Sequence, residues 1–386
     1  MNIGIFTNAY KPIISGVVNS IELIKQGMES RGHKVYIFAP GCKGYKDEEE
    51  NVYRFSSVNL TNRVKFPLAI PYSYSLFSMI PYLDLDIIHT HHPFLLGEVG
   101  AGFSKKLKIP LVYTFHTQFE QYSHYIPFPQ DLVKKLARFS VVNYAQKCSL
   151  IICPSTSILS LLKNYGITSP IEFIPNAVDL RSFKKGNPQR IRDKYNISEE
   201  EKLLIYVGRI GLEKNLGFML QAFKNIKDQV PEAKLMIVGE GPELESTKEL
   251  AKYLGINERV IFPGRVEYKE IPSYFAAGYA FIMTSTTEVK PLALLEAMAS
   301  GLPVAAISAA GSSDTINHNF DGLLTPYDME AFCDALLKIL KDQAFHDRLS
   351  IGALKTSENY SIDTTSKKLE DLYKSLSKKN KVKAVC

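Results

Sequence analysis

Two carboxylates and a proline stand out in the stretch TSTTEVKPLALLEAMASGLPV, residues 284–304. Glu288 and Glu296 are separated by seven residues, part expected loop and part expected helix. One carboxylate can therefore face a cleft while the other faces along its wall. Carboxylates accept hydrogen bonds from paired hydroxyls, so this spacing suits the binding of a sugar or a ribose. Standing alone, Glu296 would equally fit the surface of a helix.

Two cations lie close together in YVGRIGLEKN, residues 206–215. Arg209 ends an expected strand and Lys214 lies near the start of the next expected helix, so both converge on one place with the helix amides. Arginine offers a planar fork and lysine a point charge, and together they suit a diphosphate. The alternative is a pair of ordinary surface cations beside a turn.

Glycines at two strand-to-helix turns could let a ligand approach the backbone. Gly16 follows the first expected strand, and the helix N-terminus beside it would favour an anion. Gly239 in IVGEGPEL repeats this plan, but the third glycine of a dinucleotide fingerprint is absent. The turns therefore do not predict NAD binding, and a plain turn is the alternative for Gly16.

Histidines gather after two expected strands of the first half. His89, His91 and His92 come from DIIHTHH, and His116 ends the run IPLVYTFHT. No carboxylate or cysteine follows His89, His91 and His92 at metal-ligand spacing, so we expect these three to line a binding pocket, with a metal site as the alternative. Taken alone, His116 fits a structural role at the end of its strand. The Asp-x-Asp of residues 84–86 precedes its strand and should lie at the opposite edge of the sheet.

Residues 101–163 combine aromatic rings with positive charge, since eight basic residues stand against two acidic ones. Rings with polar edges suit a lipid–water boundary, and anionic headgroups attract lysine and arginine. We expect this region to face an anionic membrane surface; a solvated basic face with the rings in the core is the alternative. No nucleic-acid recognition motif accompanies the charge. The rings are Tyr113, Phe115, Phe119, Tyr122, Tyr125 and Phe128.

Short apolar runs alternate with helical patterns through both halves of the chain. This alternation predicts an α/β fold with two Rossmann-like, doubly wound parallel sheets. Ligands of such sheets bind at the carboxyl edge of the strands, and we expect the two edges to face each other across a cleft. The expected strands are NIGIFT, HKVYIFAP, NVYRFSS, DIIHTHH, IPLVYTFHT, SLIICPS, IEFIPN, KLLIYVGR, AKLMIVGE, RVIFPGR, YAFIMTST, PVAAIS and DGLLTP.

The length and pattern of the chain set the expected domain limits. A chain of 386 residues is too long for one typical core, and the apolar pattern is interrupted at DLRSFKKGNPQRIRDKYNISEEE. We predict domains at residues 1–180 and 201–360, joined by a linker at 181–200. A C-terminal helix with a basic tail at 361–386 should cross back to the N-terminal domain.

The composition is that of a globular protein, with 45% hydrophobic and 22% charged residues. Five cysteines without a CxxC pair predict a reducing compartment with no disulfides and no zinc site. The first residues, MNIGIFTNAY, predict a strand and not a signal peptide. Three prolines interrupt the most apolar region, residues 66–83, so a spanning helix is not expected there.

These motifs together resemble the retaining nucleotide-sugar glycosyltransferases of family four, which have the GT-B fold. The resemblance rests on Glu288-x7-Glu296, on GRIGLEKN and on IPNAVD, and it covers nearly the whole chain. It implies a hexosyltransferase whose C-terminal domain binds a nucleotide-sugar substrate, with no cofactor and no metal. The implied donor-binding residues are Gly16, Arg209, Lys214, Gly239, Arg265, Val266, Glu288, Lys290, Pro291, Leu292 and Glu296.

The resemblance also implies individual roles. Arg209 and Lys214 would hold the diphosphate and stabilise its developing charge, while Glu296 would bind the ribose. Arg265 and Val266 would face the base. The implied catalytic residues are His116, Arg209, Lys214 and Glu288, with Glu288 on the transferred sugar; the implied acceptor-side residues are His91, His116, Phe119, Tyr122 and Tyr125.

The N-terminal half looks like the bacterial enzymes that glycosylate diacylglycerol, on the segments PIISGVVNSI, DIIHTHHPFLLG and YTFHTQFEQYSHYIPFP. We therefore expect transfer of glucose from UDP-glucose to a membrane lipid such as diacylglycerol. The enzyme should be cytoplasmic and peripheral on the inner face of the cell membrane. Alternatives are a phosphatidylinositol mannosyltransferase that uses a GDP-sugar, a transferase to a soluble acceptor, an inactive nucleotide-sugar-binding module and a nucleotide-sugar epimerase.

One position departs from the family pattern. The third residue after the first glutamate is usually glycine, and here it is Pro291, preceded by Lys290. Proline suits the start of a helix, so the helix that carries Glu296 should persist. Lys290 should add a mobile cation and shift the sugar preference toward a charged donor such as a UDP-uronic acid.

Overall fold

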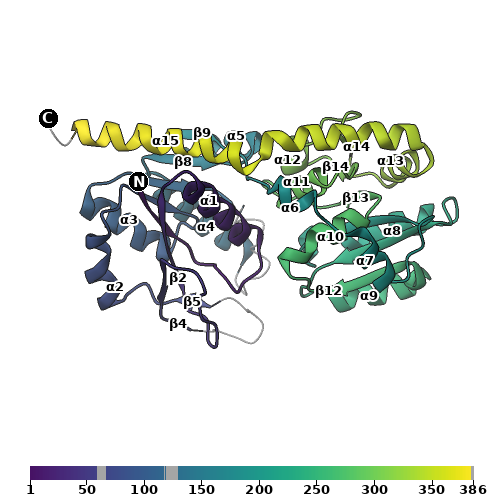
Figure 1. Ribbon diagram of the computed structural model, residues 1–386, viewed down its shortest axis with the longest axis horizontal. Helices are drawn as coiled ribbons and strands as arrows, with labels where there is room; N and C mark the ends of the chain where they lie inside the picture. Colours follow the sequence, from purple (N-terminus) through teal and green to yellow (C-terminus); the bar gives the residue numbers. More distant parts are fainter. Residues whose placement is uncertain (59–66, 117, 119–128, 384–386) are drawn as a thin grey trace. The chain divides into compact units, whose positions relative to one another are not determined.

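The computed structural model describes residues 1–58, 67–116, 118 and 129–383. The chain forms two compact units, and each is described by itself. The first unit contains Met1–Ala177 and Ile362–Cys386, and the second contains Val178–Ser361. Figure 1 shows that each unit is a sheet with helices packed against it.

The first unit is built on a seven-stranded sheet in which every pairing is parallel. Its order is β3-β2-β1-β6-β7-β8-β9, so the winding reverses between β1 and β6. Its strands are β1 (Asn2–Phe6), β2 (Lys34–Pro40), β3 (Val52–Phe55), β6 (Ile87–Thr90), β7 (Leu111–Thr114), β8 (Leu150–Cys153) and β9 (Ile171–Phe173). Its helices are α1 (Gly16–Ser30), α2 (Tyr74–Met79), α3 (Leu96–Leu107), α4 (Gln130–Ala145), α5 (Thr156–Asn164) and α15 (Ile362–Lys383).

The second unit repeats this plan with a six-stranded parallel sheet, ordered β12-β11-β10-β13-β14-β15. Its winding reverses between β10 and β13. Its strands are β10 (Lys202–Val207), β11 (Ala233–Val238), β12 (Val260–Gly264), β13 (Ala280–Met283), β14 (Val304–Ile307) and β15 (Gly322–Thr325). Its helices are α6 (Leu180–Phe183), α7 (Pro188–Lys194), α8 (Leu216–Ile226), α9 (Leu244–Tyr253), α10 (Ile271–Ala277), α11 (Leu292–Ala299), α12 (Ala310–Ser313), α13 (Met329–Lys341) and α14 (Gln343–Ser357).

The prediction of two parallel α/β sheets is confirmed, and every strand named from the sequence is present. Central strands such as β6 and β13 are buried along their whole length, because helices cover both faces of each sheet. The structure adds a short antiparallel pair, β4 (Ser57–Val58) and β5 (Leu68–Ala69), which the sequence pattern did not predict.

Residues 181–200 do not form the predicted linker. They lie inside the second unit, where α6 and α7 place Phe183, Ile191 and Ile197 in its core at 2%, 1% and 5% exposure. The guanidinium of Arg192 donates to the carbonyl oxygens of Ser198 and Ala277, which fixes the segment to the end of α10. The high charge of this stretch suggested a linker, but its widely spaced apolar residues are enough to bury it.

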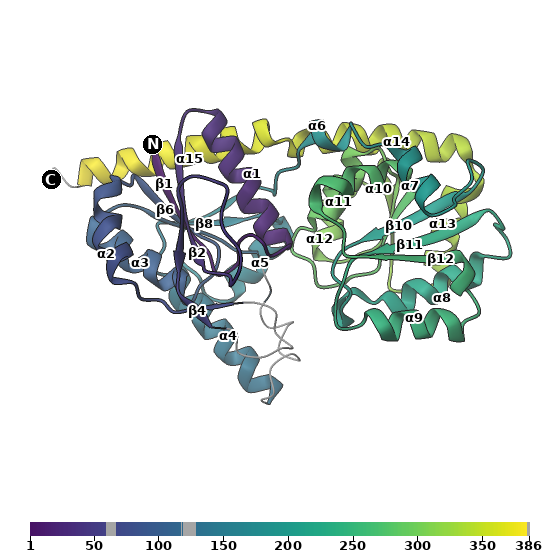
Figure 2. The same ribbon diagram turned by 60° about the horizontal axis from the view of Figure 1, so that its bottom comes forward.

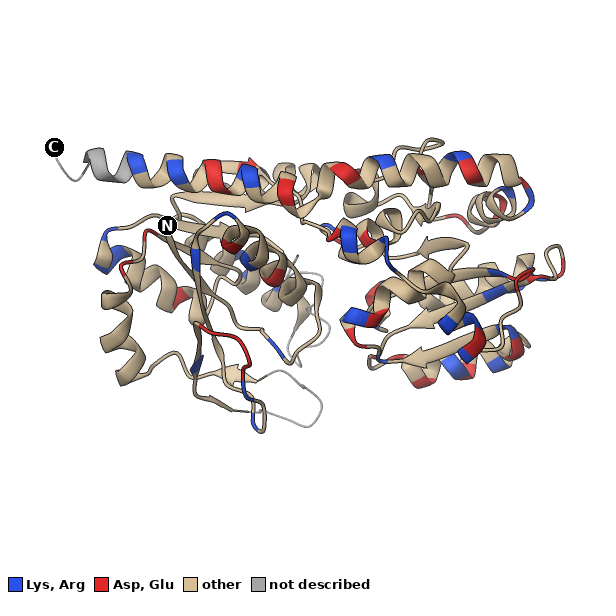
Figure 3. Ribbon diagram, viewed as in Figure 1, with Lys and Arg blue, Asp and Glu red and all other residues tan. Residues whose placement is uncertain are grey.

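The last helix, α15, packs on α1 in the first unit, although the two helices lie at opposite ends of the sequence (Figures 1 and 2). A Cβ atom on Gly27 of α1 would lie 1.8 Å from Ser366 Oγ, so only glycine permits this close approach. The buried hydroxyl of Tyr373 lies 2.6 Å from His89 Nδ1. Figure 3 shows basic and acidic residues alternating along the helix.

A buried carboxylate of α15 binds the segment between α1 and β2. Glu370 is 7% exposed and accepts from Lys374, from Arg31 at 2.7 Å and from His33 at 2.9 Å. Hydrogen bonds from Lys374 and Arg31 lower the pKa of Glu370 from 4.5 to about 2. The ionised carboxylate is therefore favoured in the folded state.

We predict that Glu370→Gln lowers the thermal midpoint at pH 7, because the charged contacts to Arg31 and Lys374 are lost. The difference from the wild type should shrink as pH falls from 4.5 toward 2, since a lowered pKa stabilises the folded state only where the group is ionised. Thermal unfolding followed by circular dichroism across this range is the measurement. Glu98→Gln, which removes the exposed Lys147–Glu98 pair, is the matched control and should change little. A deficit for Glu370→Gln that does not depend on pH would contradict the ionic account.

Candidate functional sites at the carboxyl edges of the two sheets

In the second unit, the loops after β10 and β13 meet where the winding of the sheet reverses. Ligands of doubly wound sheets bind at this switch point. Arg209 and Lys214 lie in the first of these loops, and Glu288 and Pro291 lie in the second. The predicted cations and carboxylates are therefore brought to the same edge of one sheet.

Buried hydroxyls join these two loops. Thr284 Oγ1 donates to the carbonyl oxygens of Lys214 and Asn215 at 2.9 and 3.1 Å, and Asn215 Nδ2 donates back to Thr284 O at 3.1 Å. Ser285 Oγ donates to Glu213 O at 3.2 Å. Thr284 and Ser285 are not among the residues predicted for the site. Hydroxyl residues directly after an apolar strand were the available signal.

Lys214 and Glu288 contact each other directly in an ion pair. Lys214 is 8% exposed, and Glu288 is half-buried beside it. The carboxylate thus balances a buried cation, whose charge would otherwise be costly to remove from water. Arg209 is exposed at the end of β10, and its backbone oxygen accepts from Tyr206 Oη at 3.0 Å.

Glu296 lies inside α11, and its side chain is not on the surface of the unit. It is 4% exposed, and Tyr268 Oη donates to its Oε1 at 2.9 Å. Burial raises the pKa of Glu296 to about 7, and the hydrogen bond from Tyr268 partly opposes this rise. The surface alternative for Glu296 is therefore wrong. Tyr268 was missed because nothing in the sequence spacing links it to α11.

Pro291 immediately precedes α11, and the helix continues through Glu296 as expected. Lys290, however, is not the predicted mobile cation. It is 5% exposed, with its Nζ 3.3 Å from Asp314 O and 4.6 Å from the centre of the Tyr360 ring. Burial lowers its pKa to about 8. The shift toward a charged donor rested on a mobile Lys290, so it loses its basis.

Four further predicted donor residues follow strands of the same sheet, and two of them pack on its core. Gly239 has φ +146°, and a Cβ atom there would lie 1.8 Å from the carbonyl oxygen of Gly208, so the loops after β10 and β11 touch through their backbones. Arg265 is exposed just after β12, whereas Val266 packs partly on the core. Leu292 is 7% exposed and belongs to the core of the unit.

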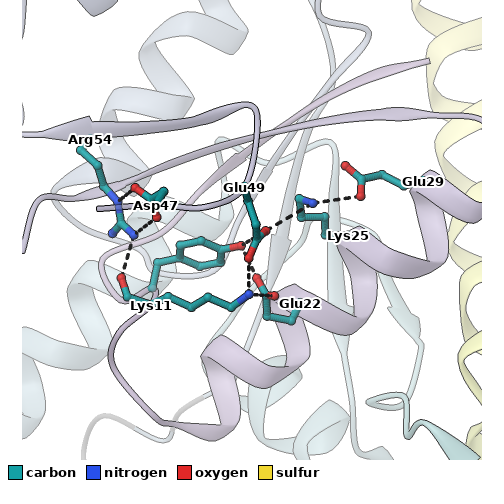
Figure 4. A network of polar contacts seen from close by, with 8 residues as sticks. Lys11, Glu22, Lys25, Glu29, Asp47, Glu49 and Arg54 are labelled. Carbon is teal, nitrogen blue, oxygen red and sulfur yellow. Dashed lines mark hydrogen bonds and ion pairs between the residues drawn. The ribbon is translucent and has the colours of Figure 1, made fainter. Parts of the chain in front are cut away.

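In the first unit, Gly16 is the first residue of α1, where the capping Ser15 Oγ accepts from Val18 N at 3.3 Å. A charged network holds the preceding loop (Figure 4). Arg54 donates to Lys11 O at 2.7 Å and to Asp47, and Lys11 Nζ pairs with Glu22 and Glu49. Tyr10 Oη donates to Glu22, and Lys25 pairs with Glu29 and Glu49. The backbone that leads into α1 is thereby fixed from several sides.

The histidines lie at the carboxyl edge of the first sheet. His91 Nδ1 is 2.7 Å from His116 Nε2, and the two rings are stacked with centroids 5.0 Å apart. His91 is 1% exposed and His116 is half-buried, so His116 is the member of this pair with exposed surface. His91 thus has almost no exposed surface of its own, and its place in an acceptor pocket stays a prediction. Phe119, Tyr122 and Tyr125 lie outside the described residues.

The two other histidines of this strand end form hydrogen bonds with neighbouring residues. His89 lies between Tyr373 and Thr114, and His92 Nδ1 accepts from Asn8 N at 3.2 Å. Within the described residues, no three histidines, cysteines or acids gather as a metal-binding group. Asp86 accepts from Asn2 N at the start of β1, which places the Asp-x-Asp at the amino edge, as expected.

Comparison with known proteins matches both halves of the chain. Residues 14–182 match the description Glycosyltransferase Family 4, and residues 187–356 match Glycosyl transferases group 1. The chain is 35% identical over 312 residues to the alpha-monoglucosyldiacylglycerol synthase of Streptococcus pneumoniae, covering 79% of this chain and 71% of that protein. It is 29% identical over 401 residues to the synthase of the same name from Acholeplasma laidlawii, covering 99% of each.

A solved structure supports the same fold. The Anabaena protein Alr3699/HepE in complex with UDP-glucose matches with a TM-score of 0.80 at 21% sequence identity, over 97% of this chain and 100% of that one. This likeness shows that the two chains share one fold. The chain is therefore a GT-B glycosyltransferase, a hexosyltransferase that belongs to glycosyltransferase family 4.

Proposed function

We propose that this enzyme transfers glucose, with retention of configuration, from UDP-glucose to diacylglycerol. The contact between Lys214 and Glu288 at the switch point of the second sheet carries the donor part of the proposal. The names of the two synthases similar to this chain support a diacylglycerol acceptor, and the UDP-glucose complex of HepE supports the donor.

In the proposed reaction, Arg209 and Lys214 bind the diphosphate. When the donor arrives, its phosphate oxygens replace Glu288 as the partner of Lys214, and Glu288 becomes free to accept from hydroxyls of the sugar. Negative charge grows on the diphosphate as the glycosidic bond breaks, and the two fixed cations stabilise it. We propose that these cations suffice without a metal.

We predict that Lys214→Ala lowers kcat/KM for UDP-glucose by about 10²-fold or more, the loss typical of removing one preorganised charge. The measurement is formation of labelled lipid from UDP-glucose and diacylglycerol vesicles. Lys224→Ala changes an exposed lysine of α8 and serves as the matched control. An unchanged rate for Lys214→Ala would remove this residue from the donor site.

Glu296 predicts a pH dependence of donor binding. A carboxylate accepts from two ribose hydroxyls, whereas a protonated carboxyl gives up part of this capacity. Because burial raises the pKa of Glu296 to about 7, KM for UDP-glucose should fall as pH rises from 6 to 8. The dependence should be lost in Glu296→Gln. A wild-type KM that stays level over this range would argue against Glu296 as the ribose ligand.

Helix α4 supports attachment to a membrane surface. Leu132, Leu136 and Phe139 lie on one face of it, at 51%, 58% and 66% exposure, and the exposed Lys135 and Arg138 lie beside them. Figure 2 shows α4 extending beyond the other helices of the first unit. No helix within the described ranges is both long and apolar enough to cross a bilayer. We propose that α4 lies on an anionic lipid surface, where the enzyme meets its acceptor.

We predict that the double variant Leu136→Ser and Phe139→Ser lowers partitioning onto vesicles of anionic lipid by about tenfold or more, because apolar surface on the helix is lost. Sedimentation of protein with vesicles measures the partitioning. Ile351→Ser, at an equally exposed position of α14, is the control and should bind like the wild type. Equal partitioning of all three proteins would show that α4 does not dock the enzyme.

A further inference from the structure

One hydrogen bond in the histidine group determines what His116 can offer a ligand. His91 Nδ1 and His116 Nε2 are 2.7 Å apart, so one nitrogen donates and the other accepts. Both rings are uncharged near neutral pH, because burial lowers the pKa of His116 to about 3 and that of His91 well below its usual value. Only one proton therefore lies between the two rings.

The other nitrogen of His91 distinguishes the two possible arrangements. His91 Nε2 is buried and has no hydrogen-bond partner among the described residues. If His116 donated, His91 would carry its own proton on Nε2, as a buried N–H with nothing to accept it. If His91 donates from Nδ1, Nε2 is only an unused lone pair. Orphaned buried N–H groups are the rarer of the two defects, so the second arrangement is favoured.

The neighbouring histidines hold the His91 ring in this orientation. The His89 and His91 ring centroids are 4.4 Å apart, so His91 lies against His89 on one side and His116 on the other. His89 is itself fixed between the Tyr373 hydroxyl and Thr114 Oγ1, each at 2.6 Å. His91 cannot turn its ring without disturbing these contacts.

We propose that His91 is a positioning residue that fixes His116 as the tautomer with its proton on Nδ1. His116 Nε2 is then occupied as an acceptor, and His116 presents an N–H donor. Such a group binds an oxygen atom, such as a hydroxyl or carbonyl oxygen of a substrate. It does not remove a proton from the acceptor hydroxyl. The substrate side of this inference rests on the proposed transferase function, whereas the tautomer does not.

The tautomer can be measured without any substrate, in the full chain labelled with ¹⁵N-histidine. Long-range ¹H–¹⁵N spectra at pH 7 should show the proton of His116 on Nδ1 and a bare Nε2, with the signals assigned from their loss in His116→Asn. Free neutral imidazole side chains prefer the proton on Nε2. A His116 signal with the proton on Nε2 would therefore overturn the proposal directly.

Variants separate positioning from packing. His91→Leu removes the donor and should return His116 to the Nε2–H form, while His91→Asn keeps a side-chain N–H and should restore the Nδ1–H form. Tyr373→Phe disturbs His89 but leaves the His91–His116 bond, so the His116 tautomer should not change. If His91→Leu fails to fold, the wild-type and His91→Asn spectra still decide the matter. A His116 tautomer that is the same in His91→Leu as in the wild type would refute the role of His91.

The rate of glucose transfer then tests separately whether the His116 tautomer matters for the reaction. With UDP-glucose and diacylglycerol vesicles, His91→Leu should lower kcat about tenfold with little change in KM for the donor, and His91→Asn should recover most of the loss. If the wild type transfers no glucose to lipid, the proposed function fails and the tautomer result stands. If the wild type is active and His91→Leu keeps its kcat, the positioning role fails while the function stands.

Discussion

The contact between Lys214 and Glu288 is the interaction on which the arrangement of the second unit's site depends. A lysine that is nearly buried at a sheet edge needs an opposite charge, and the chain supplies one from the next strand of the sheet. This is possible only because the winding reverses between β10 and β13, which makes their following loops neighbours. The hydroxyls of Thr284 and Ser285 then fix the positions of the two loops relative to each other through hydrogen bonds to backbone oxygens. The protein's own contacts therefore hold the two loops together at this edge.

The same principle of internal pairing recurs in the first unit. The loop before α1 is held by Arg54 and by the ion pairs of Lys11, and the strand-end histidines bond to one another, to buried hydroxyls or to nearby backbone groups. In both sheets the reversal point brings together loops that are far apart in the sequence. Polar side chains that look like independent ligand contacts in the sequence are thus partners of each other.

The strands, the two sheets and the residues at the edge of the second sheet could be predicted from the sequence, because apolar runs and strand ends are local features. The directions in which the side chains point could not be predicted from the sequence. Lys290 points to Tyr360 and Asp314 and not toward an open edge, and Tyr268 meets Glu296 across two elements with no fixed spacing. The predicted linker failed for a related reason. Burial of Phe183 and Ile191 depends on α10, which is distant in the sequence, and the local charge gave no sign of it.

The docking of α15 on α1 has a consequence for how the protein is made. Translation delivers every residue of the second unit, 178–361, before Tyr373 and Glu370 leave the ribosome. The second unit can complete its sheet during synthesis, while the first unit still has His89 and Arg31 without their partners from α15. The half of the chain that is synthesised first therefore cannot complete its fold until the last helix has been synthesised.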